Sequence, residues 1–317
     1  MNKKILVTAL SFRRSKQAMD LLAAQGFQII ESPYNRALQE NEMLELIPGM
    51  AAIVAGNDEI TAKVIAAGLP TLKIIARSGA GYNTIDVKAA KQGGVVVTNT
   101  PGANSKSVAD LTMAMILSLA RRIPRLNQSL HKGIWEKETG EELGGKILGV
   151  VGTGNIGTEV IKRAVAFDMR IIAYNDQICG DLIAKYGVSY SPLTEVIAQS
   201  DFLTLHVPAV AETVGMMNQT VFQSMKRTAY LINTARGELV VENDLCDALE
   251  QGKIAGAALD TFAVEPLTES RLHSFDNVIL TPHIGANTFE ASERVGIMAA
   301  REVIQVLSGM APGHSVN

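Results

Sequence analysis

Short apolar runs alternate with longer amphipathic stretches along the first hundred residues. The runs are rich in Val, Ile and Ala and favour buried strands, whereas the stretches between them carry apolar residues at helical spacing. Strands connected by helices in this order are typical of a parallel sheet. We expect strands at 4–9, 27–31, 51–55, 72–76 and 95–98, with helices at 15–25, 41–47, 61–67 and 85–92.

The same alternation begins again near Lys146 and ends in one long amphipathic helix at 288–308. Before it, the turn formers at 98–105 predict a crossing between domains, and Ser107 is expected to cap a buried helix at 109–120. The strands of this second part are expected at 147–151, 170–174, 202–206, 229–233, 255–259 and 278–281.

Composition narrows the class of protein. The 317 residues are enough for two cores, and 47% hydrophobic with 19% charged residues fits a soluble α/β protein. A net charge of −3 without a basic block argues against a nucleic-acid partner or a membrane surface. Cys179 and Cys246 show no metal-ligand spacing, so we expect no metal site and a reducing, cytoplasmic setting. The apolar run after Lys4 is too short for a secretory signal.

A glycine pattern follows the strand at 147–151 and opens a helical stretch at 158–167. It reads Gly152-Thr153-Gly154-Asn155-Ile156-Gly157. In this setting Gly152 would make the tight turn, Gly154 would let a pyrophosphate approach the backbone, and Gly157 would bring the helix close to the sheet. Because free N–H groups at a helix N-terminus attract phosphate, the pattern predicts a dinucleotide site.

The fold predicted from these observations is α/β, with two doubly wound parallel-sheet domains flanking a cleft. A flavodoxin-like substrate-binding domain would comprise residues 1–99 plus 288–317. A Rossmann domain that binds the dinucleotide would comprise residues 100–287.

The end of the second Rossmann strand bears on the choice of cofactor. An acid there usually holds the ribose hydroxyls, but the sequence has Asn175, with Asp176 one position later. No Lys or Arg at 175–178 could receive a 2′-phosphate, which favours NAD over NADP. The discrimination is expected to be soft, because Asn175 is neutral; a simple turn is the alternative interpretation.

Three ionisable residues, Arg236, Glu265 and His283, lie just past predicted strands. Since doubly wound sheets bind ligands at the carboxyl ends of their strands, the three are expected at one edge. A cation, a carboxylate and a histidine are the groups that hydride transfer to a carbonyl requires. Taken singly, each has a plainer explanation: a loop histidine, a domain-interface ion pair or a surface acid.

These motifs together resemble the D-isomer-specific 2-hydroxyacid dehydrogenases over essentially the whole chain. The resemblance rests on motifs in the family's order: Gly79-Ala80-Gly81-Tyr82-Asn83, Leu143-Gly144-Gly145-Lys146, the glycine pattern, Asn233-Thr234-Ala235-Arg236-Gly237 and Pro282-His283-Ile284-Gly285-Ala286. The segments at 99–101, 121–124 and 133–136 are most similar to the D-3-phosphoglycerate dehydrogenase branch, in a short form without a regulatory domain.

The resemblance implies a role for each residue. His283 would be the general acid in keto-acid reduction and the base in oxidation. Glu265 would bond its other ring nitrogen and favour the imidazolium. Arg236 would bind the substrate carboxylate and polarise the reacting oxygen. The remaining expected contacts are Asp260 with the nicotinamide carboxamide; Asn155, Ile156, His206, Pro208, Thr213, Thr234, Ala235 and Gly285 with the cofactor; and Arg77, Ser78, Gly79, Ala80 and Gly81 with the substrate.

Two further residues bear on the oligomeric state and on substrate binding. Trp135 lies where the family has an arm that packs on a second subunit, which implies a homodimer; local packing is the alternative. Lys137 occupies a position from which the branch can offer a basic residue to the partner's substrate.

Arg77 is well placed for a phosphate, and the branch implies 3-phosphoglycerate and 3-phosphohydroxypyruvate as the substrate pair. Asp58 would oppose a phosphate if it faced the cleft, since the branch usually has a basic residue in this loop. Reduction of hydroxypyruvate or glyoxylate, or oxidation of another small D-2-hydroxy acid, therefore stays open. A dinucleotide-sensing binding protein, similar to the corepressors related to this family, is the remote alternative.

Overall fold

The structure is a computed structural model that describes residues 3–317, and the chain divides into two compact units. The first unit ends at Ser107 and resumes at Ala286–Asn317, and the second is Val108–Gly285. The first crossing comes later than the expected 99/100 because the turn-forming segment still bonds to the first unit. The Thr100 N–H donates to the Gly79 carbonyl at 3.0 Å.

The return crossing lies two residues before the expected 287/288. Gly285 stays with the second unit, where its N–H donates to Asp260 at 2.8 Å. Asn287 belongs to the first unit, where Arg14 donates to its side-chain oxygen at 2.6 Å.

Five parallel strands form the sheet of the first unit, in the order β2-β1-β3-β4-β5. This is the flavodoxin-like order, and its switch point lies between β1 and β3. The predicted strands are all present, with the first ending at Val7. The elements are β1 (Lys4–Val7), β2 (Gln28–Glu31), β3 (Ala52–Ala55), β4 (Ile74–Arg77), β5 (Val96–Thr98), α1 (Leu10–Arg14), α2 (Lys16–Ala23), α3 (Glu40–Leu46), α4 (Ala62–Gly68), α5 (Val87–Gln92) and α13 (Phe289–Leu307).

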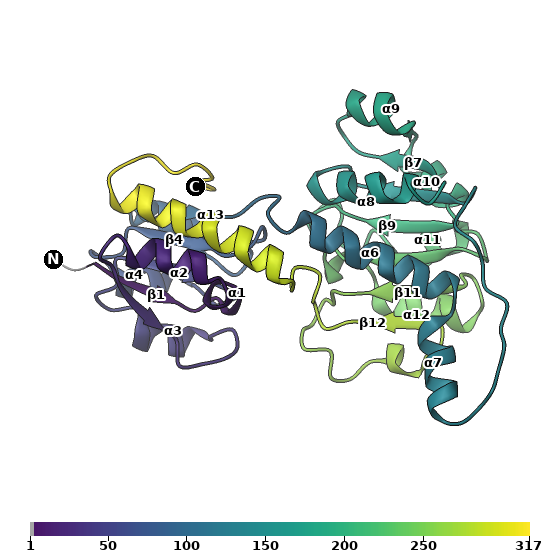
Figure 1. Cartoon of the computed structure of the whole chain (residues 1–317), viewed down its shortest axis with the longest axis horizontal. Helices are drawn as coiled ribbons and strands as arrows, with labels where there is room; N and C mark the ends of the chain where they lie inside the picture. The colour runs from purple at the N-terminus through teal and green to yellow at the C-terminus, as the bar shows by residue number, and fades with distance from the viewer. Residues whose placement is uncertain (1–2) are drawn as a thin grey trace. The chain divides into compact units, whose positions relative to one another are not determined.

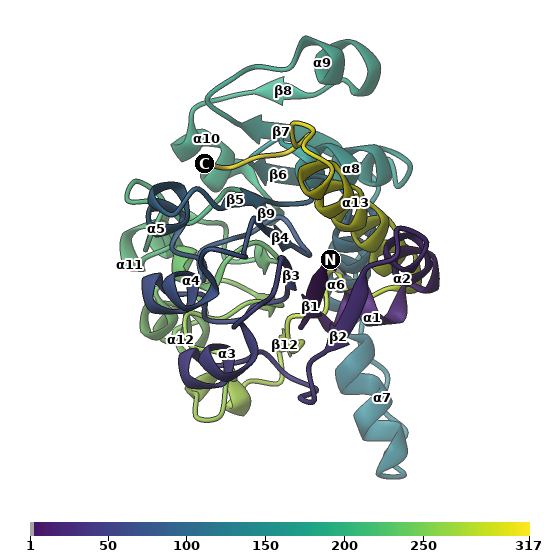
Figure 2. The same cartoon turned by 90° about the vertical axis from the view of Figure 1, so that its left-hand side faces the viewer.

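Alternate side chains of these strands enter two separate cores. Ile5 and Val7 of β1 pack with α1, α2 and α13, whereas Leu6 packs on the opposite face with α3, α4 and α5. The C-terminal helix α13, yellow in Figures 1 and 2, lies beside α2. Residues from both ends of the chain therefore build one face of this sheet.

The sheet of the second unit has seven parallel strands in the order β12-β11-β10-β9-β6-β7-β8. Counted from β6 this is the Rossmann order with one strand added, and the switch point lies between β6 and β9. The elements are β6 (Ile147–Val151), β7 (Arg170–Tyr174), β8 (Ser189–Tyr190), β9 (Phe202–Leu205), β10 (Tyr230–Asn233), β11 (Gly256–Leu259), β12 (Val278–Leu280), α7 (Ile123–His131), α8 (Asn155–Val165), α9 (Gly180–Tyr186), α10 (Leu193–Gln199), α11 (Gln219–Ser224) and α12 (Glu242–Glu250).

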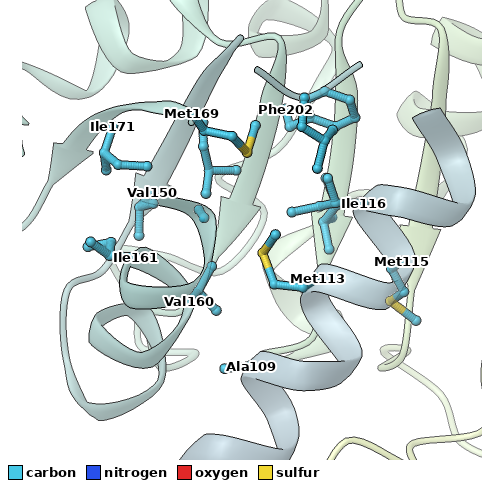
Figure 3. Packing of buried hydrophobic residues seen from close by; sticks show 14 of the residues in the cluster. Ala109, Met113, Met115, Ile116, Val150, Val160, Ile161, Met169, Ile171 and Phe202 are labelled. Atoms are coloured by element: carbon cyan, nitrogen blue, oxygen red, sulfur yellow. The ribbon is translucent and has the colours of Figure 1, made fainter. Parts of the chain in front are cut away.

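The helix α6 (Ser105–Ala120) connects the units and begins earlier than its sequence predicts. Ser107 is inside the helix instead of capping it, and its hydroxyl lies 2.8 Å from that of Thr288. From Ala109 onward α6 packs with α8 against β6, β7 and β9, and Figure 3 shows Ile116, Val160 and Phe202 in this core. The predicted fold class, two doubly wound parallel sheets, is confirmed.

Candidate active site

The glycine loop connects β6 to α8 and has the shape that a pyrophosphate requires. Gly152 has φ +96°, and a Cβ there would lie 2.7 Å from the His206 carbonyl. A Cβ on Gly157 would lie 2.0 Å from the Gly152 oxygen, whereas one on Gly154 would meet nothing within 4 Å. Since the first N–H groups of a helix lack intrahelical partners, α8 presents donors beside this open space. The loop therefore fits a dinucleotide.

Residues after β7 are bonded to this loop. The Thr153 N–H donates to the Asn175 side-chain oxygen at 3.0 Å, and the Asn175 amide donates to the Gln177 carbonyl at 2.8 Å. Asp176 is exposed and accepts a bond of 3.3 Å from the Tyr174 hydroxyl. Both residues lie at the carboxyl end of β7, where the ribose is expected.

Across the switch point, His206 follows β9. Its Nε2 lies 3.0 Å from the Thr204 hydroxyl, and its Nδ1 is buried without a hydrogen-bond partner among the described residues. Burial lowers the pKa of His206 to about 3, so the ring is neutral near neutral pH. Farther along this segment, the Thr213 hydroxyl donates to the Pro208 carbonyl at 2.6 Å and thereby closes the loop.

A buried aspartate organises the turn that follows β12. Asp260 is 1% exposed and accepts bonds from the Thr281 hydroxyl at 2.5 Å and from the Ile284 and Gly285 N–H groups at 2.8 Å each. His283 lies inside this turn with φ +51°, a value uncommon outside glycine. Asp260 therefore fixes the backbone that carries the imidazole, in addition to the carboxamide contact expected of it.

The His283 imidazole meets a carboxylate from the neighbouring loop. Its Nδ1 lies 2.8 Å and 3.1 Å from the two Glu265 oxygens. The Phe262 N–H donates to Glu265 at 3.0 Å and orients this side chain. Because both side chains are exposed, Nε2 of the imidazole is available for a proton transfer.

The loop that carries Arg236 is fixed from beneath. The fully buried Asn233 donates to the Arg236 carbonyl at 2.8 Å and accepts from the Ala235 N–H at 3.1 Å. A Cβ on Gly237 would lie 1.9 Å from the Phe262 carbonyl carbon, so this loop and the Glu265 loop are in close contact.

Two threonines support the same loop. The Thr112 hydroxyl donates to the Val108 carbonyl at 2.9 Å and lies 3.0 Å from the Thr234 hydroxyl, which can therefore donate to it. The register pairs Asn233 with Leu259 and Leu259 with Leu280, so Arg236, Glu265 and His283 all follow strand ends at one edge of the sheet.

The loop after β4 holds the expected substrate residues of the first unit. Arg77 donates to the Asn57 side chain and to the Ser78 carbonyl, and the Ser78 hydroxyl lies 3.0 Å from that of Ser11. Gly79 has φ +148°, and a Cβ there would lie 2.8 Å from the Arg77 guanidinium. The glycine therefore leaves room for this side chain over the turn that continues into Ala80 and Gly81.

Asp58 does not oppose a phosphate in the way its sequence position suggests. It is fully buried and accepts bonds from the Thr8 hydroxyl, the Gly56 N–H at 2.8 Å and the Leu38 N–H at 2.9 Å. The carboxylate is thus used inside the first unit, and Asn57 is the residue that meets Arg77.

Sequence reasoning did not single out Thr281, Asn233 or Tyr190. Asn233 begins a motif and Thr281 ends a predicted strand, but nothing in their spacing shows that their side chains bond backbone groups or a carboxylate. Tyr190 lies on β8, which is too short for a periodic signal. Its hydroxyl donates to Thr153 Oγ1 of the glycine loop at 3.1 Å.

Other possible sites lie away from this edge or are absent from the described residues. A cavity of about 400 Å³ lies at the opposite, amino ends of β10, β11 and β12, lined by residues that include Arg122, Tyr230 and Asn277. Within residues 3–317, no three His, Cys, Asp or Glu side chains are grouped to hold a metal ion. None of the helices described is both long and apolar enough to cross a bilayer.

Comparison with known proteins decides the family. Residues 113–285, more than half of the chain, match the family model described as "D-isomer specific 2-hydroxyacid dehydrogenase, NAD binding domain". The chain belongs to this family. The cofactor of the matched domain is NAD, and the glycine loop described above fits it.

Two curated relatives differ in length and in name. The chain is 40% identical over 293 residues to a D-3-phosphoglycerate dehydrogenase of Synechocystis sp., a match covering 92% of this chain and 53% of that protein. It is 44% identical over 276 residues to a hydroxypyruvate reductase of Thermotoga maritima, covering 85% and 89%. This chain thus spans about half the length of the phosphoglycerate dehydrogenases it matches.

A solved structure supports the same architecture. The TT0316 protein of Thermus thermophilus is similar with a TM-score of 0.90 at 32% identity, covering 99% of this chain and all of that one. The fold is therefore shared over nearly the whole sequence.

Proposed function

We propose that this family member transfers hydride between NAD(H) and a small D-2-hydroxy or 2-keto acid, with 3-phosphoglycerate and 3-phosphohydroxypyruvate as the substrate pair. The His283–Glu265 pair carries the proposal, because it stands at the carboxyl edge of the sheet that bears the glycine loop. A histidine oriented by a carboxylate is suited to general acid–base catalysis.

In this proposal NAD, when bound, accepts the hydride in oxidation and NADH supplies it in reduction. His283 Nε2 removes the hydroxyl proton in one direction and returns it in the other. Glu265 holds the imidazole by Nδ1 and fixes the orientation of the ring. Arg236 pairs with the substrate carboxylate, for which a planar guanidinium provides two parallel donors. Asp260 keeps the His283 turn in place.

The phosphate preference rests on Arg77. Its guanidinium lies over the turn after β4 and is oriented by Asn57, while Asp58 is buried and engaged elsewhere. A phosphate gains strongly from charge-assisted bonds to arginine. The loop after β4 therefore favours a negatively charged substrate tail.

The experiment is a panel of 2-hydroxy and 2-keto acids assayed with NAD(H), with kcat/KM as the measure. 3-Phosphohydroxypyruvate, hydroxypyruvate and glyoxylate are the decisive members. The proposal expects the phosphorylated acid to give the highest kcat/KM. Reduction of none of these acids would contradict the dehydrogenase assignment itself.

Hydroxypyruvate reduction is the second candidate, and one observation favours it. Beside Arg77, the polar side chains of this loop cluster are the neutral Asn57, Ser78 and Ser11, which suit a hydroxyl group. A kcat/KM higher for hydroxypyruvate than for its 3-phosphate would select this candidate over the first.

We further propose a homodimer formed through α7 and the segment that follows it. None of the α7 residues is buried, and Ile123, Leu130, Ile134 and Trp135 are each more than half exposed. Exposed apolar side chains grouped in this way usually mark a protein interface. We also propose a cytoplasmic setting, since Cys179 and Cys246 are unpaired.

Light scattering on Trp135→Ser tests the dimer. The wild-type chain is expected to elute with twice the chain mass and the variant to shift toward the monomer. Phe167→Ser, on an apolar residue exposed elsewhere in the unit, is the matched control and should not shift. A monomeric wild-type protein would contradict the proposal.

A further inference from the structure

The loop after β7 departs from the usual arrangement of a dinucleotide site. The end of this strand normally presents an acid to the adenosine ribose, and this chain has the neutral Asn175 there. Asn175 is half-buried, and both ends of its carboxamide are already bonded. Its oxygen accepts from the Thr153 N–H and its nitrogen donates to the Gln177 carbonyl.

A tyrosine reaches the same point of the glycine loop from the sheet edge. The Tyr190 hydroxyl donates to Thr153 Oγ1 at 3.1 Å and accepts from the Cys179 N–H at 3.3 Å. Thr153 is 8% exposed, and its carbonyl accepts from the Thr158 hydroxyl at 3.0 Å. Both residues thus connect the loop after β7 to Thr153 of the glycine loop. Asn175 bonds the backbone N–H of Thr153, and Tyr190 bonds its hydroxyl.

The acid of this segment comes one residue later than in the usual arrangement. Asp176 directly follows Asn175 and is exposed. No Lys or Arg occurs from 171 to 184. The next basic residue, Lys185, is paired with Asp181 at 3.2 Å. A 2′-phosphate at the end of β7 would therefore meet a carboxylate without a cation from this segment to compensate it.

We propose that Asn175 and Tyr190 position the glycine loop, and that Asp176, one residue later than the usual acid, selects NAD against NADP. The proposal rests on the assignment of NAD to this domain. It makes Asn175 and Tyr190 positioning residues for the phosphates and Asp176 the specificity-determining residue.

The test measures the dissociation constants of NADH and NADPH for the full chain by nucleotide fluorescence, without any substrate. Asp176→Asn should lower the ratio of the NADPH to the NADH constant about tenfold, the factor that removal of one nearby like charge corresponds to. Asp181→Asn is the matched control, because it removes an acid five residues away that already has a cation partner. Its ratio should stay within about twofold of wild type.

Asn175→Ala and Tyr190→Phe should weaken both nucleotides in parallel, by about three- to tenfold for one lost hydrogen bond, and leave the ratio unchanged. Circular dichroism checks that each variant is folded. An unchanged ratio in Asp176→Asn, or a changed ratio in Asn175→Ala, would overturn the proposal while leaving NAD as the cofactor. Failure of the wild-type chain to bind either nucleotide would overturn both.

Discussion

At the carboxyl edge of each sheet, one buried aspartate gathers neighbouring segments through a hydroxyl and two backbone N–H groups. Asp58 does this in the first unit and Asp260 in the second. The segments that they fix differ. Asp58 fixes a turn that presents the neutral Asn57 to Arg77, whereas Asp260 fixes the turn that carries His283. The same set of bonds therefore supports a turn with a neutral amide in one unit and a turn with an imidazole in the other.

The strongest test of this difference is His283→Ala. The turn should survive, because Asp260 bonds its backbone, while kcat falls by about 100-fold or more, the scale of general acid–base assistance. Steady-state turnover together with the NADH dissociation constant measures both. His273→Ala removes an exposed histidine of the same unit and should leave kcat near wild type. Unchanged turnover in His283→Ala would remove the proton-transfer role.

The next test compares the two buried carboxylates directly. Asp58→Asn and Asp260→Asn should each lower the free energy of unfolding by about 1–3 kcal/mol, because the new amide cannot accept all three bonds. Only Asp260→Asn should also reduce kcat, by on the order of 10- to 100-fold, through misplacement of His283. Urea unfolding and steady-state kinetics give the two quantities. Equal losses of kcat in both variants would contradict the proposal that only Asp260 supports the proton-transferring histidine.

Arg77→Ala tests what the first unit contributes. It should lower kcat/KM for a phosphorylated substrate about tenfold more than for its unphosphorylated analogue, the loss expected for one charge-assisted contact. Arg36→Ala is the matched control, since Arg36 pairs with Glu42 in the same unit. Equal losses on both substrates would leave no reason to favour a phosphate.

The smallest expected effect concerns pH and His206. Its pKa is about 3 in the folded chain, below the ordinary value of 6.5, so acid protonates the unfolded state first. The stability it contributes is complete above pH 6.5 and declines as the pH falls toward 3. When the pH is lowered from 7 to 5.5, the free energy of unfolding should fall by about 1 kcal/mol less in His206→Asn than in the wild type, as measured by urea titration at each pH. An identical loss in wild type and variant would contradict the buried, neutral ring.

Sequence patterning predicts the repeating parts of this fold because they repeat. Central strands of both sheets, such as β3, β9 and β11, are buried along their whole length, as expected when parallel strands are covered on both faces. The strand β8 and the helix α7 cannot be predicted in this way. The two residues of β8 are too few to show a period, and α7 has no buried side chains that would mark an apolar face against a core.

The site shows a similar limit. Arg236, Glu265 and His283 can be found because they follow strands in recognisable motifs. The partners of Asp58 cannot, because Thr8 and Leu38 lie far from it in the chain and meet it only once the sheet has formed. Its sequence position beside a loop suggests a surface charge, whereas the folded chain gives it an internal role. Side-chain to backbone bonds of this kind leave no periodic trace.

The return of α13 to the first unit has a consequence for biosynthesis. Its Ala299, Ala300 and Val303 fill the core beside α1 and α2, on a sheet whose strands all precede residue 99. When residues up to Gly285 have emerged from the ribosome, every strand of the second sheet is present. The first sheet at that point still lacks α13, which covers one of its faces. We therefore expect the later-made half to reach its final packing first, with the earlier half waiting, partly uncovered, for the last helix to emerge.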